Sequence, residues 1–211
     1  MENREEPYYT PDEYLALEDA ALEKHEYFDG RIYAMTGASR NHAQITMNLL
    51  LQLGMQLRGR SCRVFHMDVK VLVSETGLFT YPDASALCGE PRFKDARSAI
   101  LLNPSTIVEV LSPSTERYDR GRKFEHYERI PSMREYVLIA QDYRHVERFR
   151  RADASKEWGY LAVDDLEASV ELPSIGCTLA VRDVYEHVDV PPRPPLRAVY
   201  EIPPDYVAAN F

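Results

Sequence analysis

The sequence predicts an α/β fold, and three observations lead to that prediction. A run of aromatic and β-branched residues with one tight turn, at residues 25–35, precedes a long amphipathic helical pattern at residues 42–58. A nearly continuous apolar run from Thr106 to Leu111 is typical of a strand that is covered on both faces. Three further β-rich runs with polar turns between them predict a meander. The 211 residues are enough for one domain with a sizeable core.

The first helix is predicted from its capping residues. Thr10 can cap the helix, Pro11 fits the first helical position, and Glu13 completes a capping box. We therefore expect a short helix that ends near Ala21.

A hairpin and the long helix follow. The dipeptide Asp29-Gly30 favours a tight turn, which places Glu26 on the first strand of the hairpin. The long helix opens with His42, repeats apolar residues at four-residue spacing and ends at Gly59.

The remaining elements follow from apolar runs and helix breakers. We expect a strand from Phe79 to Cys88 that is irregular at Pro82, because proline cannot donate to a sheet ladder. Hydroxyl side chains at residues 112–115 can cap a helix over residues 116–129, and Pro131 stops it. The other predicted elements are strands at 62–67, 69–74, 135–140, 144–151, 158–163 and 169–172, a short helix at 182–188 and an extended proline-rich tail over 191–204.

The composition, 45% hydrophobic and 28% charged, is ordinary for a globular protein. The acidic N-terminus lacks the basic and apolar regions of a signal peptide, and no apolar run approaches the ~20 residues that span a bilayer. These features predict a cytoplasmic protein without a membrane segment. Cys62, Cys88 and Cys177 form no C-x-x-C pair, so we expect three reduced core residues rather than a disulfide or a zinc site.

The net charge of -9 argues against broad, sequence-blind binding to nucleic acid, which depends on many basic contacts to phosphates. The stretch from Leu111 to Arg151 is locally basic, with ten basic and seven acidic residues. These charges either decorate solvated faces or form a binding patch.

Two acids occur in strand-like surroundings, Asp83 and, 26 residues later, Glu109. A carboxylate in an apolar strand is costly unless it is paired or binds a metal ion. Glu109 therefore either binds a metal, forms a salt bridge to a neighbouring strand, or reaches solvent at a strand end. Oxygen ligands suit Mg²⁺ or Mn²⁺, and the carbonyl of Val110 is a natural third ligand.

Lys123 follows Glu109 by 14 residues, on the predicted helix. It could orient an attacking water or neutralise charge that develops on a phosphate. The alternative is an ordinary surface salt bridge to Asp119 or Glu125, which the helix by itself favours.

Two residues outside this stretch could join such a site. Glu26 would add a second carboxylate if the hairpin faces the same cleft, and His42 could contact phosphate or act as an acid. His42 could equally be a helix-start residue that satisfies local hydrogen bonds. The chain contains no G-x-S-x-G elbow, phosphate loop or G-x-G-x-x-G fingerprint.

The sequence resembles the Uma2 family (DUF820), which is similar to restriction endonucleases of the PD-(D/E)XK superfamily. The resemblance covers roughly residues 9–185. It rests on the order and spacing of H-E-Y-F-D-G-R, a helix opening with His42, Y-P-D-A-S-A-L-C, I-V-E-V-L-S-P-S-T, D-R-G-R-K-F-E-H-Y and I-P-S-M-R-E-Y-V-L-I.

The resemblance implies a restriction endonuclease-like fold, in which helices flank a mixed central β-sheet that carries a Mg²⁺-type site. It implies that Asp83 and Glu109 are metal ligands, that Lys123 is the catalytic lysine and that Glu26 is an extra acid of the site. Many superfamily members carry the lysine two residues after the acid, where this chain has Leu111. The tryptophan typical of the family's E-Y-W run is also replaced, by Val137, which affects packing more than chemistry.

The resulting hypothesis is a metal-dependent endonuclease, with one domain at residues 1–190 and a tail at 191–211. It would hydrolyse phosphodiester bonds in nucleic acid, with DNA as the expected substrate, and work as a homodimer. The alternative is a catalytically inactive nuclease-fold module that binds nucleic acid or a protein partner. A third option is hydrolysis of another phosphoester.

Overall fold

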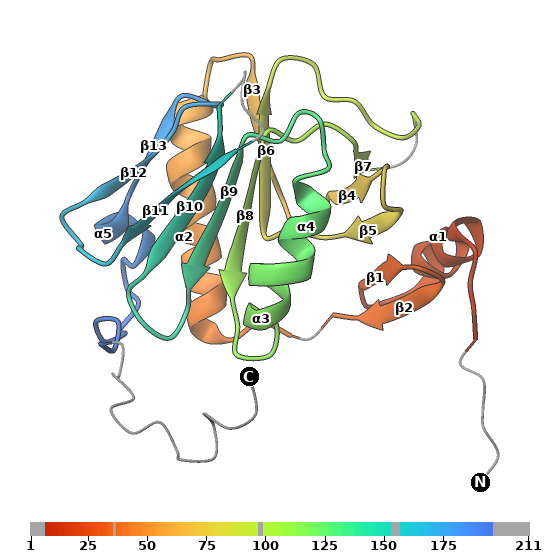
Figure 1. Ribbon diagram of the computed structural model, residues 1–211, viewed down its shortest axis with the longest axis horizontal. Coiled ribbons are helices and arrows are strands. Elements are labelled where there is room, and N and C mark those ends of the chain that lie inside the picture. The colour runs from red at the N-terminus through yellow and green to blue at the C-terminus, as the bar shows by residue number, and fades with distance from the viewer. Residues whose placement is uncertain (1–6, 36, 97–98, 153–156, 196–211) are drawn as a thin grey trace, which may run out of the picture.

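The computed structural model describes residues 7–35, 37–96, 99–152 and 157–195, and its strands form two main sheets and a small one. The larger sheet has six strands in the order β11-β10-β9-β8-β6-β3 (Figure 1). Its strands are β3 (Cys62–His66), β6 (Ala84–Cys88), β8 (Thr106–Leu111), β9 (Glu135–Ala140), β10 (Val146–Arg151) and β11 (Trp158–Val163). Only β8 and β9 pair in parallel, so the sheet is mixed.

The central strands of this sheet are buried along their whole length. Every residue of β8 and of β9 is buried, which explains their apolar sequences. Val137, at the position of the family's tryptophan, is fully buried in β9. The mixed α/β fold predicted from the sequence is confirmed.

The second sheet contains the N-terminal hairpin and has the order β2-β1-β5-β4-β7. Its strands are β1 (His25–Phe28), β2 (Arg31–Ala34), β4 (Lys70–Val73), β5 (Leu78–Thr80) and β7 (Ile100–Leu101). Asp29 and Gly30 both have positive φ, 47° and 76°, as the tight turn requires. This hairpin was also predicted. It pairs β1 with β5, which is followed in the chain by β6.

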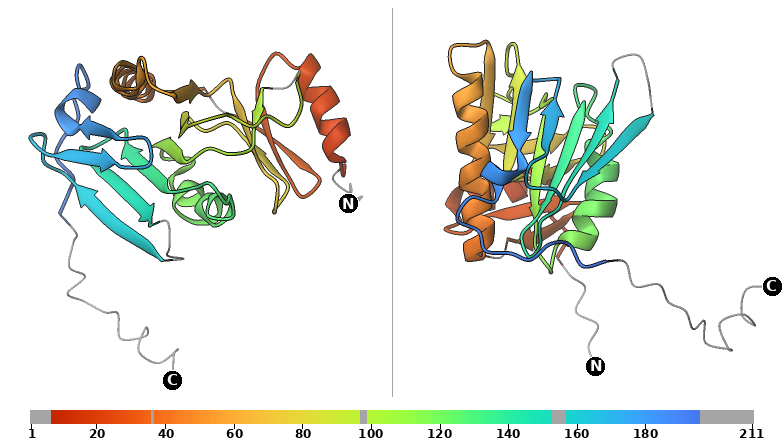
Figure 2. Two further views of the ribbon diagram at one scale, coloured as in Figure 1. Left: turned by 90° about the horizontal axis from the view of Figure 1, so that it is seen from above. Right: turned by 90° about the vertical axis from the view of Figure 1, so that its left-hand side faces the viewer.

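Helices cover both faces of the six-stranded sheet (Figure 2). Helix α2 (Arg40–Leu57) lies on one face, beside α5 (Val181–Val184) and the small sheet of β12 (Ser169–Leu172) and β13 (Cys177–Ala180). The segment of α3 (Glu116–Tyr118), η1 (Asp119–Lys123) and α4 (Phe124–Tyr127) lies on the other face. Helix α1 (Pro11–Ala20) has the predicted capping box of Thr10 and Glu13 and packs beside the hairpin.

Several boundaries differ from the prediction. Pro82 does more than make one strand irregular: it separates β5 from β6, which belong to different sheets. Helix α2 begins two residues before His42, because Ser39 supplies the cap by accepting a hydrogen bond from the His42 backbone. Strands β7 and β13 were not predicted. The proposed tail lies mainly at residues 196–211, outside the described residues, so the domain boundary at residue 190 stays a prediction.

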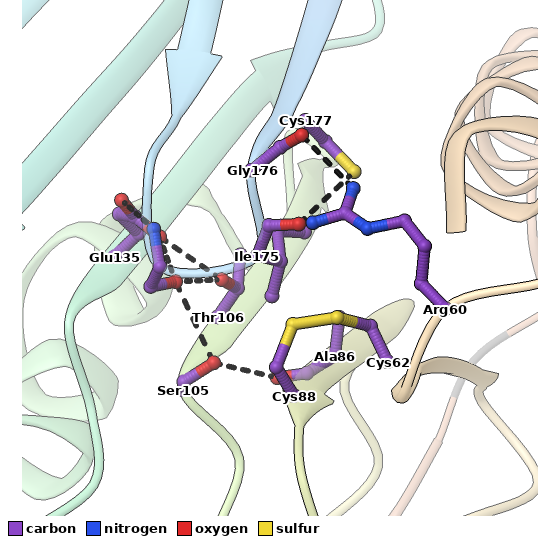
Figure 3. The surroundings of a disulfide bond; sticks show 11 residues. Arg60, Cys62, Ala86, Cys88, Ser105, Thr106, Glu135, Ile175, Gly176 and Cys177 are labelled. Atoms are coloured by element: carbon purple, nitrogen blue, oxygen red, sulfur yellow. Dashed lines mark hydrogen bonds between the residues drawn. A yellow bond between two sulfur atoms is a disulfide. The ribbon is translucent and has the colours of Figure 1, made fainter.

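The prediction of three reduced cysteines is wrong. Cys62 and Cys88 form a disulfide, and Cys177 is the free, buried cysteine (Figure 3). The two bonded residues face each other in the antiparallel register of β3 and β6. That register brings together two cysteines 26 residues apart in sequence, which no local spacing motif could indicate.

Within the described ranges, no helix has the length and apolar character needed to cross a bilayer.

Candidate active site

A cavity of about 490 Å³ opens where the two main sheets and the helical segment meet. The C-terminal end of β8, the start of β6, the start of α2 and η1 all reach it, at one end of the six-stranded sheet (Figure 1). Its acidic lining residues are Glu26, Asp83, Glu109 and Asp119, and its basic ones are His42 and Lys123. The four residues predicted for catalysis therefore lie around one cavity.

Glu109 is a buried acid, as its apolar strand predicted, with only 4% of its surface exposed. Its Oε1 accepts a hydrogen bond of 2.8 Å from the hydroxyl of Tyr127 and lies 2.9 Å from Nζ of Lys123. Burial raises the pKa of Glu109 to about 8, although the charge of Lys123 acts in the opposite direction. The side chain is thus held in place but is costly to ionise.

Lys123 is buried, not the surface residue that the helix by itself suggested. Its Nζ lies 2.9 Å from Glu109, 3.3 Å from Glu26 and 3.5 Å from Asp119. Burial alone would lower the pKa of Lys123, but the surrounding carboxylates outweigh it and raise the pKa well above the usual value. The lysine is therefore a fixed cation in this cavity.

The π-helical turn η1 explains how the lysine reaches the site. It spans Asp119 to Lys123 inside an otherwise α-helical segment, and its first and last residues are both buried. π-Turns of this kind occur often at functional sites. Asp119 was considered from sequence only as a surface partner of Lys123, and its place in the cavity was missed. Burial raises its pKa as well.

Glu26 enters the site from the hairpin. Its Oε1 accepts hydrogen bonds from the hydroxyl of Thr80 and, at 3.5 Å, from the backbone N–H of Tyr81. The hairpin therefore faces the same cavity as Glu109, which was the condition for Glu26 to join the site.

Asp83 and His42 form the other side of the site. The Asp83 Oδ2 accepts a 2.7 Å hydrogen bond from the backbone N–H of Val110 and lies 3.3 Å from Nε2 of His42. The His42 ring also bonds to the Val110 backbone. Burial would lower the pKa of His42, but the hydrogen bond and charge of Asp83 outweigh it and raise the pKa.

The charges of these six side chains do not balance. Four carboxylates face the cavity, and only one lysine and one histidine oppose them. Uncompensated buried carboxylates are costly, and a hard divalent cation is the kind of ligand that oxygen donors favour. The donor chemistry therefore fits Mg²⁺ or Mn²⁺.

The arrangement of the donors is not that of a preformed metal site. Among the described residues, no three His, Cys, Asp or Glu side chains are grouped so that they could hold one ion. Lys123 engages Glu109 and Glu26, while His42 engages Asp83. An ion would have to displace these contacts to reach the carboxylates.

The chain belongs to the Uma2 family, whose model carries the description "Putative restriction endonuclease" and matches residues 11–182. This confirms the family resemblance found in the sequence.

Two relatives come from Synechocystis sp., and both are named only as uncharacterized proteins. Protein slr1290 is 40% identical over 85% of this chain and 92% of its own length, and protein sll1609 is 36% identical over 71% and 84%. A crystal structure of "a putative nuclease belonging to DUF820" from Anabaena variabilis has a TM-score of 0.68 at 20% identity, covering 86% of this chain and 99% of that one. At that identity the likeness shows the fold.

Proposed function

We propose that this protein is a metal-dependent endonuclease that hydrolyses phosphodiester bonds in DNA. The observation that supports the proposal best is the surplus of carboxylates over basic groups in one cavity, with three of the carboxylates within 3.5 Å of the Lys123 ammonium. A solvated or purely structural cluster would not need four acids against two bases. Membership of a family whose model is described as "Putative restriction endonuclease" supports the same activity.

In this proposal Asp83, Glu109, Glu26 and the carbonyl of Val110 hold a Mg²⁺ or Mn²⁺ ion. The ion would lower the pKa of a bound water and stabilise negative charge on the scissile phosphate. Asp83 is oriented for this task by the N–H of Val110, and Glu109 by the hydroxyl of Tyr127.

Lys123 has a separate part in the reaction. Its ammonium lies 2.9 Å from Glu109 and 3.3 Å from Glu26 and so offsets their negative charge. If these carboxylates held a cation instead, the ammonium would be free to donate hydrogen bonds to the attacking water or to a phosphate oxygen. The lysine thereby stabilises charge that develops in the transition state.

The test is cleavage of supercoiled plasmid by the purified protein in Mg²⁺, in Mn²⁺ and in excess chelator. We expect nicking or linearisation that requires metal, and we expect Asp83→Asn and Glu109→Gln each to abolish it. Glu75→Gln is the matched control, because Glu75 is an exposed acid outside the cavity lining that pairs with Arg129 across 3.4 Å. Metal-dependent cutting that persists in both site variants would contradict the proposal.

A second function has one observation in its favour. Lys123 already pairs with Glu109, and His42 already pairs with Asp83. These pairings suit a nuclease-fold module that binds nucleic acid or a protein without cutting. That module would bind DNA without cleavage, and calorimetry would detect no metal binding. The same cleavage assay on a panel of RNA and other phosphoester substrates would distinguish hydrolysis of those substrates from DNA cleavage and from binding without cleavage.

The homodimer and the cytoplasmic location remain predictions from the sequence. The Cys62–Cys88 disulfide argues against the location, since such bonds are rare in cytosolic proteins.

A further inference from the structure

The hairpin presents a tyrosine beside one of the site acids. Glu26 of β1 and Tyr33 of β2 are directly opposite in the antiparallel register, so their side chains lie next to each other on one face of the hairpin. Tyr27 and Ile32, the neighbouring pair in that register, belong to the other face and pack in the small core with Tyr14. The face that carries Glu26 and Tyr33 is the one that lines the cavity.

The ring of Tyr33 is available to a ligand. Tyr33 is 49% exposed although it lines the cavity. Within the ranges that the structure describes, its hydroxyl has no hydrogen-bond partner and its ring stacks on no other ring. Tyr160, which is 57% exposed in β11, differs, because its hydroxyl donates to Glu147 and its ring packs against Phe149. The two tyrosines are similarly exposed, and only Tyr33 combines exposure with a place in the cavity lining.

The groups proposed to cut the phosphodiester are more deeply buried than this ring. Asp83, Glu109 and Lys123 are 7%, 4% and 6% exposed. A phosphate therefore has to enter a cavity of about 490 Å³ to reach them. The backbone of a single strand can bend into such a space, whereas a duplex keeps its bases paired and stacked. The burial of the site favours a strand that is unpaired where it is cut.

The charge of the chain supports the same substrate. The net charge of -9 disfavours binding through many phosphate contacts, on which sequence-blind duplex binding depends. Stacking of a base on an aromatic ring contributes affinity without charge, because every base has a π face. Met35 and Pro113 also line the cavity and extend the apolar surface that a base could contact.

We propose that Tyr33 stacks on an unpaired nucleobase next to the scissile phosphate, so that the DNA in the cavity is single-stranded at the point of cleavage. The inference rests on the proposed function, because it takes the phosphodiester to be bound beside Glu26, Asp83 and Glu109. In a duplex both faces of a base are covered by its neighbours, so Tyr33 can stack only on a base that has left the helix. The ring thus sets the preference for unpaired over paired DNA.

The first test measures binding without cleavage, by fluorescence anisotropy in Mg²⁺. The background is Glu109→Gln, which the proposed function expects not to cut. The probes are a labelled single-stranded DNA oligonucleotide, the same sequence as a duplex, and an oligomer of the same length in which every residue is abasic. We expect the single strand to bind at least about 10-fold more tightly than the duplex and than the abasic oligomer.

Variants of Tyr33 connect this preference to the ring. Tyr33→Leu keeps an apolar side chain and deletes the ring, so the single strand should bind about 10-fold more weakly and nearly as the abasic oligomer does. Tyr33→Phe keeps the ring and should retain the preference for bases. The matched control is Tyr160→Leu, which changes an exposed tyrosine outside the cavity lining and should leave DNA binding unchanged.

The second test compares cleavage of a circular single strand with cleavage of a relaxed duplex circle of the same sequence in Mn²⁺. With an intact Glu109 we expect kcat/KM to be at least about 10-fold higher on the single strand, and Tyr33→Leu should lower this value mainly by raising KM. Supercoiled plasmid, which unpairs more easily than a relaxed circle, should be cut at an intermediate rate.

The stacking contact and the proposed nuclease fail separately. Equal binding of the single strand and the duplex, or single-strand binding that is unchanged in Tyr33→Leu, would overturn the stacking contact even if the protein cuts plasmid. Absence of cleavage on every substrate would contradict the nuclease. Binding of the single strand that depends on the Tyr33 ring would then support a module that holds unpaired DNA without cutting it.

Discussion

The ammonium of Lys123 lies 2.9 Å from the Glu109 carboxylate, and both side chains are buried. The strand acid and the helix lysine thus form a close pair in the lining of the cavity. In the proposed mechanism this pair must open before Glu109 can bind a metal ion. The lysine is then both a catalytic group and a competitor of the metal.

Replacing Lys123 with methionine should separate its role as a catalytic group from its role as a competitor of the metal ion. Lys123→Met removes the competing ammonium, so we expect Mn²⁺ to bind more tightly, by about 10-fold, while DNA cleavage is lost. Isothermal titration and the plasmid assay on the same sample measure the two effects. Weaker Mn²⁺ binding in this variant would show that Lys123 supports the metal rather than competing with it. Lys24→Met, which removes a surface lysine paired with Asp68, is the control.

The hydroxyl of Tyr127 should orient Glu109 for metal binding. Tyr127 is fully buried, and its hydroxyl donates to Glu109 across 2.8 Å. Tyr127→Phe keeps the ring and deletes this bond, so we expect Mn²⁺ affinity to fall about 10-fold with little change in fold. Tyr136→Phe is the matched control, because its hydroxyl donates to the backbone of Asp119 instead. Equal effects of the two variants on Mn²⁺ affinity would mean that the tyrosines act only through packing.

Stability at low pH should depend on Glu147, which anchors the segment that carries Lys123. Burial would raise the pKa of Glu147, but the nearby His145 ring and hydrogen bonds from Tyr160 and Arg120 lower it to about 2. A lowered pKa in the folded state stabilises the protein above the unfolded value of 4.5, and this contribution disappears as pH falls toward 2.

The corresponding experiment is urea unfolding of wild type and Glu147→Gln at several pH values. The wild type should be the more stable protein at pH 6, and the difference should shrink steadily as pH falls below about 4.5. A difference that stays constant over this range would rule out the carboxylate as its origin. Arg120 lies within η1 and pairs with both Glu147 and Glu116. We therefore expect protonation of Glu147 to loosen the helical segment of α3, η1 and α4 before the rest of the protein unfolds.

The disulfide should affect stability and not catalysis. Cys62 begins β3 and Cys88 ends β6, whereas Asp83 directly precedes the first residue of β6, so the disulfide lies at the opposite end of these strands from Asp83. Closing a loop with a sequence separation of 26 is worth about 3 kcal/mol in the free energy of unfolding. We expect Cys62→Ala with Cys88→Ala to lower stability by that amount, measured by urea unfolding, with unchanged metal binding. Reducing agent should destabilise the wild type and leave the double variant unaffected.

The sequence revealed residues whose own strand or turn is unusual. Glu109 was found because an acid interrupts an apolar run, and the hairpin that carries Glu26 was found from Asp29-Gly30. Both signals are local in the sequence, so they can be recognised without knowledge of the tertiary fold. The order of elements and the mixed α/β fold followed from the same kind of pattern.

Features that depend on contacts between distant segments were not accessible in this way. Asp119 looked like a surface residue, since its burial depends on how the π-turn packs in the tertiary fold. The Cys62–Cys88 bond depends on the register of two strands, and the two-residue strand β7 is too short to leave a pattern. The partner of His42 could not be predicted for the same reason.

The central claim is that Asp83 and Glu109 bind one metal ion. The most direct measurement is an anomalous difference map from a crystal of the protein soaked in Mn²⁺. We predict one peak within about 2.2 Å of both carboxylates, with Lys123 displaced from Glu109. A map with no peak in the cavity, and with the Lys123–Glu109 pair intact at saturating Mn²⁺, would contradict the account.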